Sequence, residues 1–475
     1  MPTLLHVSDV HRTTGPRLRN ETLLAAMASD SRRWESDGIP PPDVIIVSGD
    51  LIHGADPHTE NADSEICAQY NEASEFLAAL TDEFADSDRS RVIVVPGNHD
   101  VHWDRARGAM QSMPNCPGQI ARNALEPDSG FRWDWGSQQA LQIIDDELYD
   151  SRLEHFRLFR TEFYAGLTTR PLIQDDNDLI FAEYPSLGLV VVGFASWYGN
   201  DCFCHVGDID PSALARSQKL LADSRLPVAV AVWHHSVVGG PRDQDYMDQR
   251  IVHRLIDFGF NVGLHGHQHH AGATPHELRF PDLSSMVVVG AGSLAVGDRQ
   301  LPAGECRQFN LIVIDAESET ITVHVRGMTS GGVFTSLNRP DFAGNTSLSL
   351  KLPTSPLRSE GPVENRLLDD AITAVRRQQF DKAWECLEPI REYLQSYPGR
   401  QVLIETLDGL GYYDELLEVL DEPQNADEVA KAISVLLSMR DFPRASAYLD
   451  AARPLLDDAT FRQISERIAV ERMLP

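Results

Sequence analysis

The sequence of 475 residues has no apolar stretch that approaches the roughly 20 residues of a membrane span, and its positive charges are outnumbered. Lys and Arg total 41 against 71 Asp and Glu, which gives a formal net charge of −30 at pH 7. This excess opposes non-specific adhesion to nucleic acid or to an anionic membrane. It does not exclude a nuclease, because bound metal ions reverse the sign of the charge locally.

Cysteines are also few, since the chain has six and they are scattered. Only Cys202 and Cys204 are close together, and we expect both to be reduced cysteines in a loop rather than a metal or redox site. The first predicted strand follows residues 1–3 directly, which leaves no room for a signal peptide. These features favour a cytoplasmic protein with no membrane partner.

Five short apolar runs are the most informative feature, because each is followed directly by side chains that can bind a metal ion. The runs are Leu4 to Val7, Val44 to Val47, Val92 to Val95, Val228 to Trp233 and Asn261 to Leu264. The residues that follow them are Asp9 and His11, Asp50, Asn98 to Asp100, His234 and His235, and His267 and His269. Such runs predict strands buried on both faces. Open α/β sheets place their sites at the carboxyl ends of strands like these.

The ligand types indicate two metal ions. The candidate set is Asp9, His11, Asp50, Asn98, His234, His267 and His269. Seven side chains are too many for one tetrahedral site, and their mixture of carboxylate, imidazole and amide favours Zn, Mn, Fe or Ni over Ca or Mg. No cysteine joins the set, which argues against structural zinc. We expect two divalent ions, with manganese favoured, and Asp50 as the carboxylate that bridges them. Two ions roughly 3.5–4 Å apart promote in-line displacement at phosphorus.

The order of the motifs points to a family. Asp-x-His, Gly-Asp, Gly-Asn-His-Asp, His and Gly-His-x-His together resemble the calcineurin-like metallophosphoesterases over about residues 1–335. The resemblance implies an α/β fold in which a two-sheet β-sandwich is flanked by helices. It also implies a division of ligands: Asp9, His11, Asp50 and His269 on one metal, and Asp50, Asn98, His234 and His267 on the other.

The same resemblance assigns catalytic roles. His99 would be the acid or the hydrogen-bond donor to the transition state, and Asp100 would hold His99. Of the pair His234 and His235, the first is implied as the ligand, although Ser236 stands where many members carry proline.

Other polar residues near the motifs match no ligand position of the family. His6, His53, His102, His265 and His270 are expected to be packed or solvated, with His102 and His270 as candidates to line the pocket. Arg12, Arg105, Arg107, Arg242 and Arg250 are candidates for phosphate contacts.

A domain of residues 1–337 is expected to contain a long cap-like insertion, residues 101–178. Gln138 to Tyr164 has helical spacing, and we expect most aromatic residues of the insertion to form its own small core rather than to stack on bases. After it, Leu179 to Ala182 and Leu189 to Ala195 predict a strand pair. Three further runs predict a second sheet, namely Met286 to Val289, Leu311 to Ile314 and Thr320 to Val325.

The C-terminal part is predicted to be all-helical. Residues 338–365 are rich in Pro, Ser, Asn and Gly and predict a linker. In residues 366–475 a degenerate repeat begins at Phe380, Tyr413 and Phe442, and the steps between these positions are near the roughly 34-residue period of helical-pair repeats. The pattern resembles a tetratricopeptide array, with an unrelated helical bundle as the alternative. Such a module would bind a protein partner or mediate self-association.

The sequence therefore predicts a two-metal phosphoesterase with a helical C-terminal module. A phosphodiesterase that acts on nucleic acid or nucleotides is favoured, for example a nuclease-like effector of bacterial defence or stress. The first alternative is a small-molecule or protein phosphatase. An alternative of another class is a partner-binding scaffold with a vestigial metal site, which the complete ligand set opposes.

Overall fold

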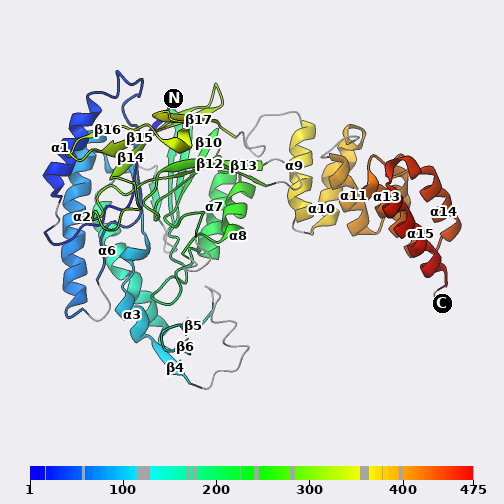
Figure 1. Ribbon diagram of the computed structural model, residues 1–475, viewed down its shortest axis with the longest axis horizontal. Helices are drawn as coiled ribbons and strands as arrows, with labels where there is room; N and C mark the ends of the chain where they lie inside the picture. Colours follow the sequence, from blue (N-terminus) through cyan, green and yellow to red (C-terminus); the bar gives the residue numbers. More distant parts are fainter. Residues whose placement is uncertain are drawn as a thin grey trace. The chain divides into compact units, whose positions relative to one another are not determined.

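Two compact units make up the described part of the chain, one up to Pro353 and one from Val363 onward. The computed structural model describes every residue except 16–17, 56–58, 115–128, 168–171, 175–178, 225, 240–244, 279–283, 354–362, 377, 395–398 and 474–475. Figure 1 gives the labels of the helices and strands. Within the described ranges, none of the helices combines the length and the apolar character needed to cross a membrane.

The N-terminal unit contains two seven-stranded sheets. The first has the order β16-β15-β14-β1-β2-β3, with β17 also paired to β15. Its strands are β1 (Thr3–Val7), β2 (Val44–Ser48), β3 (Val92–Val95), β14 (Gln308–Asp315), β15 (Thr320–Met328), β16 (Phe334–Ser336) and β17 (Ser347–Lys351). The second has the order β12-β13-β11-β10-β9-β8-β7. Its strands are β7 (Leu172–Gln174), β8 (Ile180–Tyr184), β9 (Leu189–Gly193), β10 (Val228–Val232), β11 (Val262–His265), β12 (Gly272–Leu278) and β13 (Ser284–Gly290).

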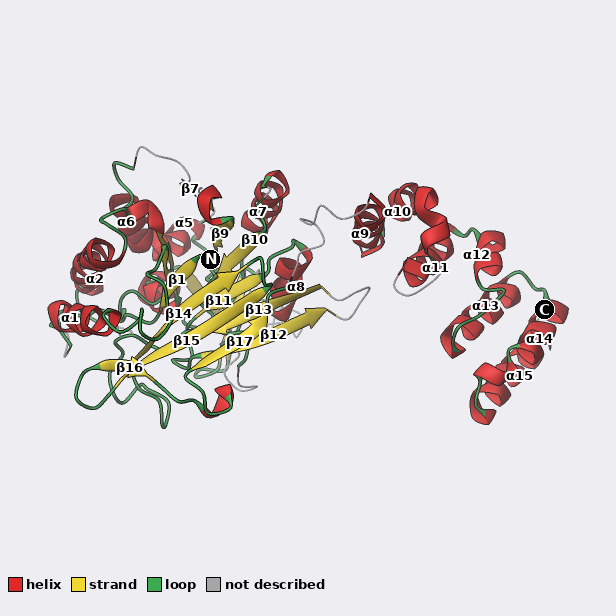
Figure 2. Cartoon of the chain, turned by 90° about the horizontal axis from the view of Figure 1, so that it is seen from above, coloured by secondary structure: helices red, strands yellow, loops and turns green. Residues whose placement is uncertain are grey.

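The apolar runs become buried strands because both of their faces are covered. In β10, Val228, Val230 and Val232 join the core that also holds β1 and β2, whereas Ala229 and Ala231 face the other way. That second face packs against helices α7 (Pro211–Asp223) and α8 (Gln249–Asp257). Helices α1 (Asn20–Ser31) and α2 (Ala62–Phe84) cover the first sheet, on the opposite side of the strands (Figure 2). The predicted helix-flanked two-sheet fold is therefore confirmed.

The predicted membership of the second sheet is wrong. Strands β14 and β15 belong to the first sheet, where Leu311 pairs with Leu5 and β15 continues the antiparallel ladder. Strand β13 lies in the other sheet, parallel to β11. The motif strands are thus divided, with β1, β2 and β3 in one sheet and β10 and β11 in the other. A run buried on both faces does not reveal its neighbour, because its periodicity is the same in either sheet. The predicted pair, β8 and β9, is antiparallel as expected.

The insertion has a small sheet of its own. Strands β4 (Met110–Met113), β5 (Phe131–Asp134) and β6 (Gln139–Ile143) have the order β4-β6-β5. Helices α3 (Trp103–Gly108), α5 (Asp146–Asp150) and α6 (Glu154–Phe163) accompany it, with a 3-10 turn at Ser151–Leu153. The helix predicted from Gln138 is therefore wrong at its start, since pairing with two neighbouring strands makes residues 139–143 a strand.

The aromatic residues of α6 do not form a separate core. Phe156, Phe159, Phe163 and Tyr164 belong to the main core of the unit, and the ring of Phe159 stacks on Tyr70 at 5.4 Å between centroids. The hydroxyl of Tyr164 donates to the carbonyl of Val92 in β3 at 2.8 Å. Hence α6 is part of the catalytic fold, and the expectation of an independent small core is wrong for these four residues.

The C-terminal unit consists of helices with a separate core. They are α9 (Val363–Arg376), α10 (Phe380–Leu387), α11 (Gly399–Leu410), α12 (Tyr413–Val419), α13 (Ala426–Ser438), α14 (Phe442–Ala451) and α15 (Asp458–Met473), with 3-10 turns at Glu388–Tyr393 and Arg453–Leu455. The three repeat positions each begin a helix, and the residues three further on, Ala383, Leu416 and Ala445, are fully buried. The helical prediction is confirmed, while the tetratricopeptide resemblance stays a prediction.

The boundary between the units differs from the predicted linker. Ser347–Lys351 forms β17, in which Leu350 pairs with Ile321 of β15. Leu352 is buried, and the carbonyl of Pro353 accepts a hydrogen bond of 2.6 Å from Asn261. The N-terminal unit therefore extends to Pro353, because a polar, serine-rich segment can still complete a sheet edge. Residues 354–362 of the expected linker lie outside the described residues.

Candidate metal centre

All seven predicted ligands lie at one place in the N-terminal unit. Strands β1, β2 and β3 are parallel, so the segments that follow them meet at one sheet edge. Strands β10 and β11 are parallel in the other sheet and bring their following residues to the same place. One contact between residues of the two sheets joins Asp50 Oδ2 to His234 Nε2 at 3.3 Å.

The first group of side chains surrounds Asp9. His269 Nε2 lies 3.2 Å from Asp9 Oδ1, and His11 Nε2 lies 3.8 Å from the same oxygen. His11 Nε2 is also 3.6 Å from Asp50 Oδ2. Ligand atoms of Asp9, His11 and His269 are close enough together to hold one ion.

The second group surrounds Asn98. Its Oδ1 lies 3.1 Å from His234 Nε2 and 3.0 Å from His267 Nδ1. The carboxylate of Asp50 lies near both groups, because its Oδ2 is close to His234 of this group and to His11 of the first group. Asp50 therefore lies between the two groups, where the sequence predicts a bridging carboxylate.

The backbone at these positions is strained. Five of the seven residues have a left-handed conformation, with φ of 52° at Asp9, 43° at His11, 53° at Asp50, 78° at His267 and 54° at His269. Each such residue costs on the order of 1–3 kcal/mol, and such strain concentrates at functional sites. Backbone hydrogen bonds from Asp9 to Gly49 and from His11 to Asp50 hold the strained segment.

Three motif glycines allow the side chains to approach. A Cβ on Gly49 would lie 2.5 Å from His234 Nδ1, and one on Gly266 would lie 2.6 Å from Asp9 Oδ2. A Cβ on Gly97 would overlap the carboxylate of Asp50. The glycines of Gly-Asp, Gly-Asn-His-Asp and Gly-His-x-His are therefore explained by steric contact with the ligand side chains of neighbouring segments.

The charge and burial of these groups fit divalent cations. Asp9 Oδ1 and both ring nitrogens of His11 are buried without a hydrogen-bond partner in the described part of the chain. Burial would raise the pKa of Asp50, but His234 and His99 together hold it well below its ordinary value. Burial would lower the pKa of His234, but Asp50 raises it to about 9. The carboxylates thus attract positive charge, and the oxygen and imidazole donors suit transition-metal ions.

His99 and Asp100 differ from the expected pair. The amide of His99 donates to Asp50 Oδ1 at 2.9 Å, and its ring Nδ1 lies 2.7 Å from the carbonyl oxygen of His53. Asp100 instead accepts hydrogen bonds from the amide of Gly97, the amide of Leu51 and the hydroxyl of Tyr70. Among the described residues no hydrogen bond joins Asp100 to His99, so the predicted contact is wrong. Asp100 orders the loops around Asp50.

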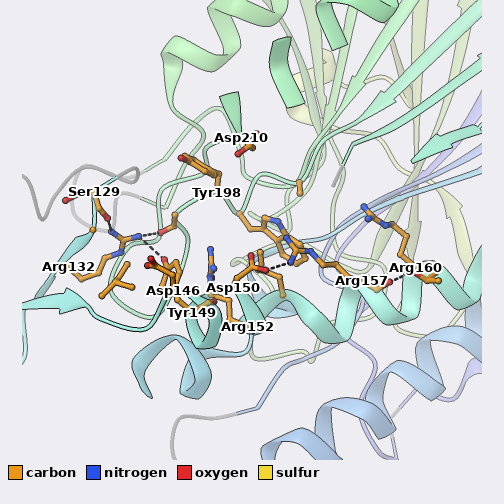
Figure 3. Close-up of a pocket in the computed structure, with 17 residues that line it drawn as sticks. Ser129, Arg132, Asp146, Tyr149, Asp150, Arg152, Arg157, Arg160, Tyr198 and Asp210 are labelled. Atoms are coloured by element: carbon orange, nitrogen blue, oxygen red, sulfur yellow. Dashed lines mark hydrogen bonds and ion pairs between the residues drawn. The ribbon is translucent and has the colours of Figure 1, made fainter. Parts of the chain in front are cut away.

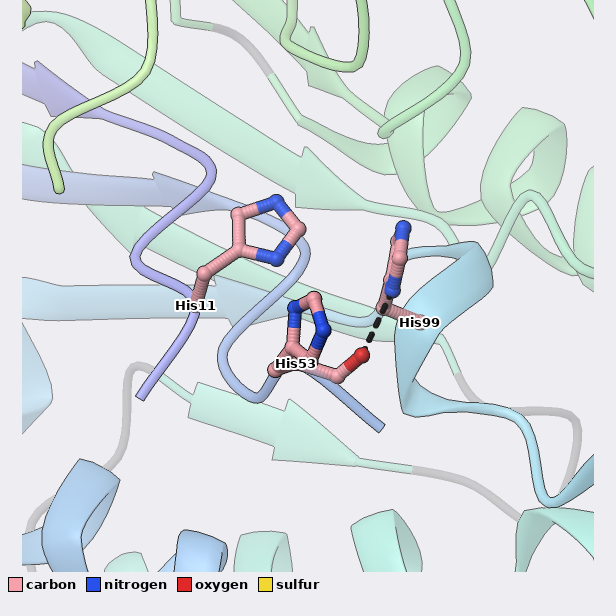
Figure 4. A group of neighbouring side chains, drawn as sticks. All are labelled: His11, His53 and His99. Atoms are coloured by element: carbon pink, nitrogen blue, oxygen red, sulfur yellow. Dashed lines mark hydrogen bonds between the residues drawn. The ribbon is translucent and has the colours of Figure 1, made fainter. Parts of the chain in front are cut away.

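His53 was expected from the sequence to be packed or solvated, but its ring lies beside those of His11 and His99. Its ring lies 5.7 Å from that of His99 and 5.9 Å from that of His11, measured between centroids (Figure 4). Ligand atoms of these three histidines are close enough to hold an ion. The signal in the sequence was its position three residues after Asp50, on the same loop. Asp245 was also missed, and its Oδ2 lies 3.5 Å from His267 Nε2.

Of the two adjacent histidines, His234 faces the site. Its Nδ1 bonds the carbonyl of Ser48 at 2.8 Å, which directs Nε2 toward Asp50 and Asn98. His235 is directed away and contacts Ser196 Oγ at 2.8 Å and Asn200 Nδ2 at 3.2 Å. The geometry therefore agrees with the order that the family pattern implies.

The remaining candidate residues have structural partners. His6 and His265 are buried and bond Ser48 Oγ and the carbonyl of Gly266, as packed histidines do. His102 is buried beside Asp63, at 3.5 Å, and His270 is 2.8 Å from Glu305.

Three of the arginine candidates are engaged elsewhere. Arg12 is buried and donates to Asn20 and Leu18, Arg105 pairs with Asp63 and Glu154, and Arg250 pairs with Asp248. Arg107 lies over the ring of Phe203, and Arg242 is outside the described residues. Cys202 and Cys204 are free, and burial raises the pKa of their thiols to about 12 and about 11.

A known protein family covers the part of the chain that holds this site. The calcineurin-like phosphoesterase family matches residues 2–271, which include all seven expected ligands and more than half of the chain. Similar solved structures include TT1561 of Thermus thermophilus, at 12% identity over 69% of this chain and 98% of that chain, with a TM-score of 0.31. They also include the calcineurin-like phosphoesterase YfkN from Bacillus subtilis, at 10% identity over 84% and 98%, with a TM-score of 0.28. A single mutant of Vps29 from Entamoeba histolytica matches at 10% identity over 74% and 99%, with a TM-score of 0.23. No curated protein sequence matches the chain. On the family match and its five motifs, the chain belongs to the calcineurin-like phosphoesterase family.

Proposed function

We propose that this protein is a dinuclear metal-dependent phosphodiesterase that acts on nucleotides or nucleic acid. The observation that carries the proposal is the position of Asp50. Its Oδ2 lies 3.6 Å from His11 and 3.3 Å from His234, so one carboxylate faces two groups of ligands. Such an arrangement suits a pair of ions rather than one.

The seven side chains then divide by their contacts. Asp9, His11, Asp50 and His269 hold one ion, and Asp50, Asn98, His234 and His267 hold the other. Bound divalent ions, for which we favour manganese, supply Lewis-acid chemistry to a phosphoryl group. The strained loops and the three close-packed glycines fix the donor atoms in advance, so that little reorganisation is needed when substrate binds.

His99 is the group we assign to proton donation. The carbonyl of His53 can only accept a hydrogen bond, so Nδ1 of His99 carries a hydrogen. The other ring nitrogen, Nε2, then donates only from the imidazolium form. His99 in that form donates a hydrogen bond or a proton to the substrate. The hydrogen bond from its backbone amide to Asp50 keeps His99 beside the expected metal ligands.

A diester is favoured over a monoester because of the two further regions that the chain contains. The insertion, with its own three-stranded sheet, and the helical C-terminal unit suit a polymer or a regulated nucleotide better than a small phosphate ester. A bacterial defence or stress effector of the nuclease type fits this organisation. The C-terminal unit is proposed to bind a protein partner or a second copy of the chain.

The test combines metal content with substrate preference. Full-length protein should bind two divalent ions per chain and hydrolyse bis-p-nitrophenyl phosphate faster than p-nitrophenyl phosphate. Asp50→Ala should lower the metal content below two and abolish turnover. The opposite substrate preference would indicate the phosphatase, and a chain without bound metal or turnover would indicate the scaffold. A panel of linear and circular DNA, RNA and cyclic nucleotides with manganese would then identify the substrate class.

A further inference from the structure

A cavity lies in the N-terminal unit, between the insertion and the segment that follows β9. Its volume is about 760 Å³, within the range of roughly 300–1,000 Å³ typical of small-molecule sites. None of the seven expected metal ligands lines it. Four arginines do: Arg132 and Arg152 lie on one wall beside Tyr149, and Arg157 and Arg160 extend along α6 (Figure 3). A cluster of four guanidinium groups contrasts with the net charge of −30 of the whole chain.

Arg132 and Arg157 have carboxylate partners among the described residues. Arg132 is buried against Asp201, with Nε 2.7 Å from Oδ2, and it also donates to the hydroxyl of Tyr149. Arg157 pairs with Asp150 at 2.8 Å. Of the other two lining aspartates, Asp210 caps the start of α7 and Asp146 is exposed. The positive charges of Arg132 and Arg157 are therefore balanced within the protein.

Arg152 differs from them. It is only 5% exposed, yet among the described residues no carboxylate lies within ion-pair distance of its guanidinium. Its Nε and Nη1 donate to the neutral carbonyls of Asn200 and Tyr149, at 3.2 and 2.9 Å. The centre of its guanidinium is 3.8 Å from the centre of the Tyr149 ring, which fixes its orientation. Asp201 and Asp150 act on Arg152 only from beyond ion-pair distance. An anion in the cavity would add the direct contact that this buried charge lacks and would offset part of its desolvation cost.

We propose that this cavity binds the phosphate group of a mononucleotide-sized ligand through Arg152, at a site separate from the metal centre. Arginine presents a planar set of donors that suits phosphate oxygens, and stacking on Tyr149 holds it ready for binding. The volume leaves room for a nucleoside beside the phosphate. Burial lowers the pKa of Arg152, although Tyr149, Asp201 and Asp150 act in the opposite direction.

Asn200 links Arg152 to the chain segment that carries an expected metal ligand. The carbonyl of Asn200 accepts from Arg152, and the side chain of the same residue contacts His235 Nε2 at 3.2 Å. His235 follows the expected ligand His234 directly in the chain. Arg152 is thus connected through Asn200 to the residue that follows His234, although binding of a ligand at Arg152 does not depend on the reaction at the metal centre.

The test is calorimetric titration of metal-loaded, full-length protein with inorganic phosphate, adenosine 5′-monophosphate and adenosine. Wild type should bind phosphate and the nucleotide, but adenosine at least tenfold more weakly. Arg152→Gln removes the charge and should weaken binding of the nucleotide by about tenfold or more, the range of one charge-assisted hydrogen bond. Arg152→Lys keeps the charge without the planar donors and should lie between the two.

Arg89→Gln is the matched control. Arg89 also donates to two main-chain carbonyls, those of Phe163 and Ala165, but it does not line the cavity. Its nucleotide affinity should stay within about twofold of wild type. Metal content and near-ultraviolet circular dichroism show whether each variant is folded. If Arg152→Gln does not fold, the nucleotide affinity of Arg152→Lys tests the proposal instead. Equal affinity in wild type and the Arg152 variants, equal affinity for adenosine, or no binding by wild type at millimolar concentration would each overturn the proposal.

Discussion

Gly97 lies so close to Asp50 that a Cβ on Gly97 would overlap Oδ1 of Asp50 and lie 2.6 Å from its amide nitrogen. The motif glycine and the carboxylate that we propose as the bridging ligand therefore depend on each other, although they are 47 residues apart in the chain. Any side chain at position 97 must displace Asp50 or the loop that carries it. This contact gives a way to disturb the metal centre without touching a ligand.

Gly97→Ala is expected to lower both metal content and turnover. The added methyl group pushes Asp50 away from His11 and His234, so fewer than two ions should remain per chain. A misplacement of about 1 Å can cost about 10²-fold in rate, and we expect a loss of at least that size with bis-p-nitrophenyl phosphate. Gly331→Ala is the control, because its Cβ would have its nearest neighbour at 3.7 Å, Thr329 Oγ1. Two bound metals and near-normal turnover in Gly97→Ala would contradict the steric argument.

His99→Ala is expected to keep both metals but to slow the reaction. General acid catalysis typically contributes 10²–10⁴-fold, and we expect a loss within roughly that range. Metal analysis by mass spectrometry and turnover of the same diester measure the two effects separately. His253→Ala, a change at an exposed histidine of α8, should alter neither. If His99→Ala loses a metal ion, then His99 is a ligand and the assignment of its role is wrong.

The sequence predicts the parts of this site that depend on local motifs, but not those that depend on tertiary contacts. The seven expected ligands could be placed at one site because each follows a buried strand and the motifs have a fixed order. The contacts between these residues across the two sheets could not be predicted. The local sequence pattern does not reveal which strand pairs with β13 or β14, so it does not define the two sheets. The role of Asp100 depends on the hydroxyl of Tyr70, which lies on a helix 30 residues away. Such contacts are set by tertiary packing rather than by a motif.

The same distinction applies to the rest of the fold. Residues 139–143 have helical spacing but form β6, because β4 and β5 offer hydrogen-bond partners on both sides. Ser347–Lys351 resembles a linker in composition and is a sheet strand for the same reason. In contrast, the helices that begin at Phe380, Tyr413 and Phe442 were predictable, since helix pairs are stabilised by contacts near in sequence.

A chain that ends at Pro353 is expected to stay folded, to bind two metals and to hydrolyse small diesters at a rate close to that of the full chain. The reason is that its core is separate from that of the helices. A chain that ends at Thr346 lacks β17 and the buried Leu352, and it should unfold at a lower temperature. Thermal unfolding and metal content should be measured for both shortened chains.

Light scattering adds the oligomeric state. A full-length dimer together with a monomeric chain ending at Pro353 would assign self-association to the helical unit. Unfolding or metal loss in the chain that ends at Pro353 would instead show that the helices complete the catalytic core, which would contradict the two-unit description.

Arg400→Ala should destabilise the C-terminal unit and leave the metal centre intact. The guanidinium of Arg400 bonds the carboxylate of Glu428 at 3.0 Å and the carbonyls of Val419 and Glu422, and both charged side chains are buried. Breaking a buried pair costs about 3–5 kcal/mol because one charge is left without a partner. Denaturant unfolding should show an early transition, whereas metal content and diester turnover stay at wild-type values. Arg391→Ala removes a largely exposed pair with Glu418, worth about 0–1 kcal/mol, and serves as the control. A parallel loss of turnover in Arg400→Ala would mean that the stability of the helices and the chemistry of the metal centre are coupled.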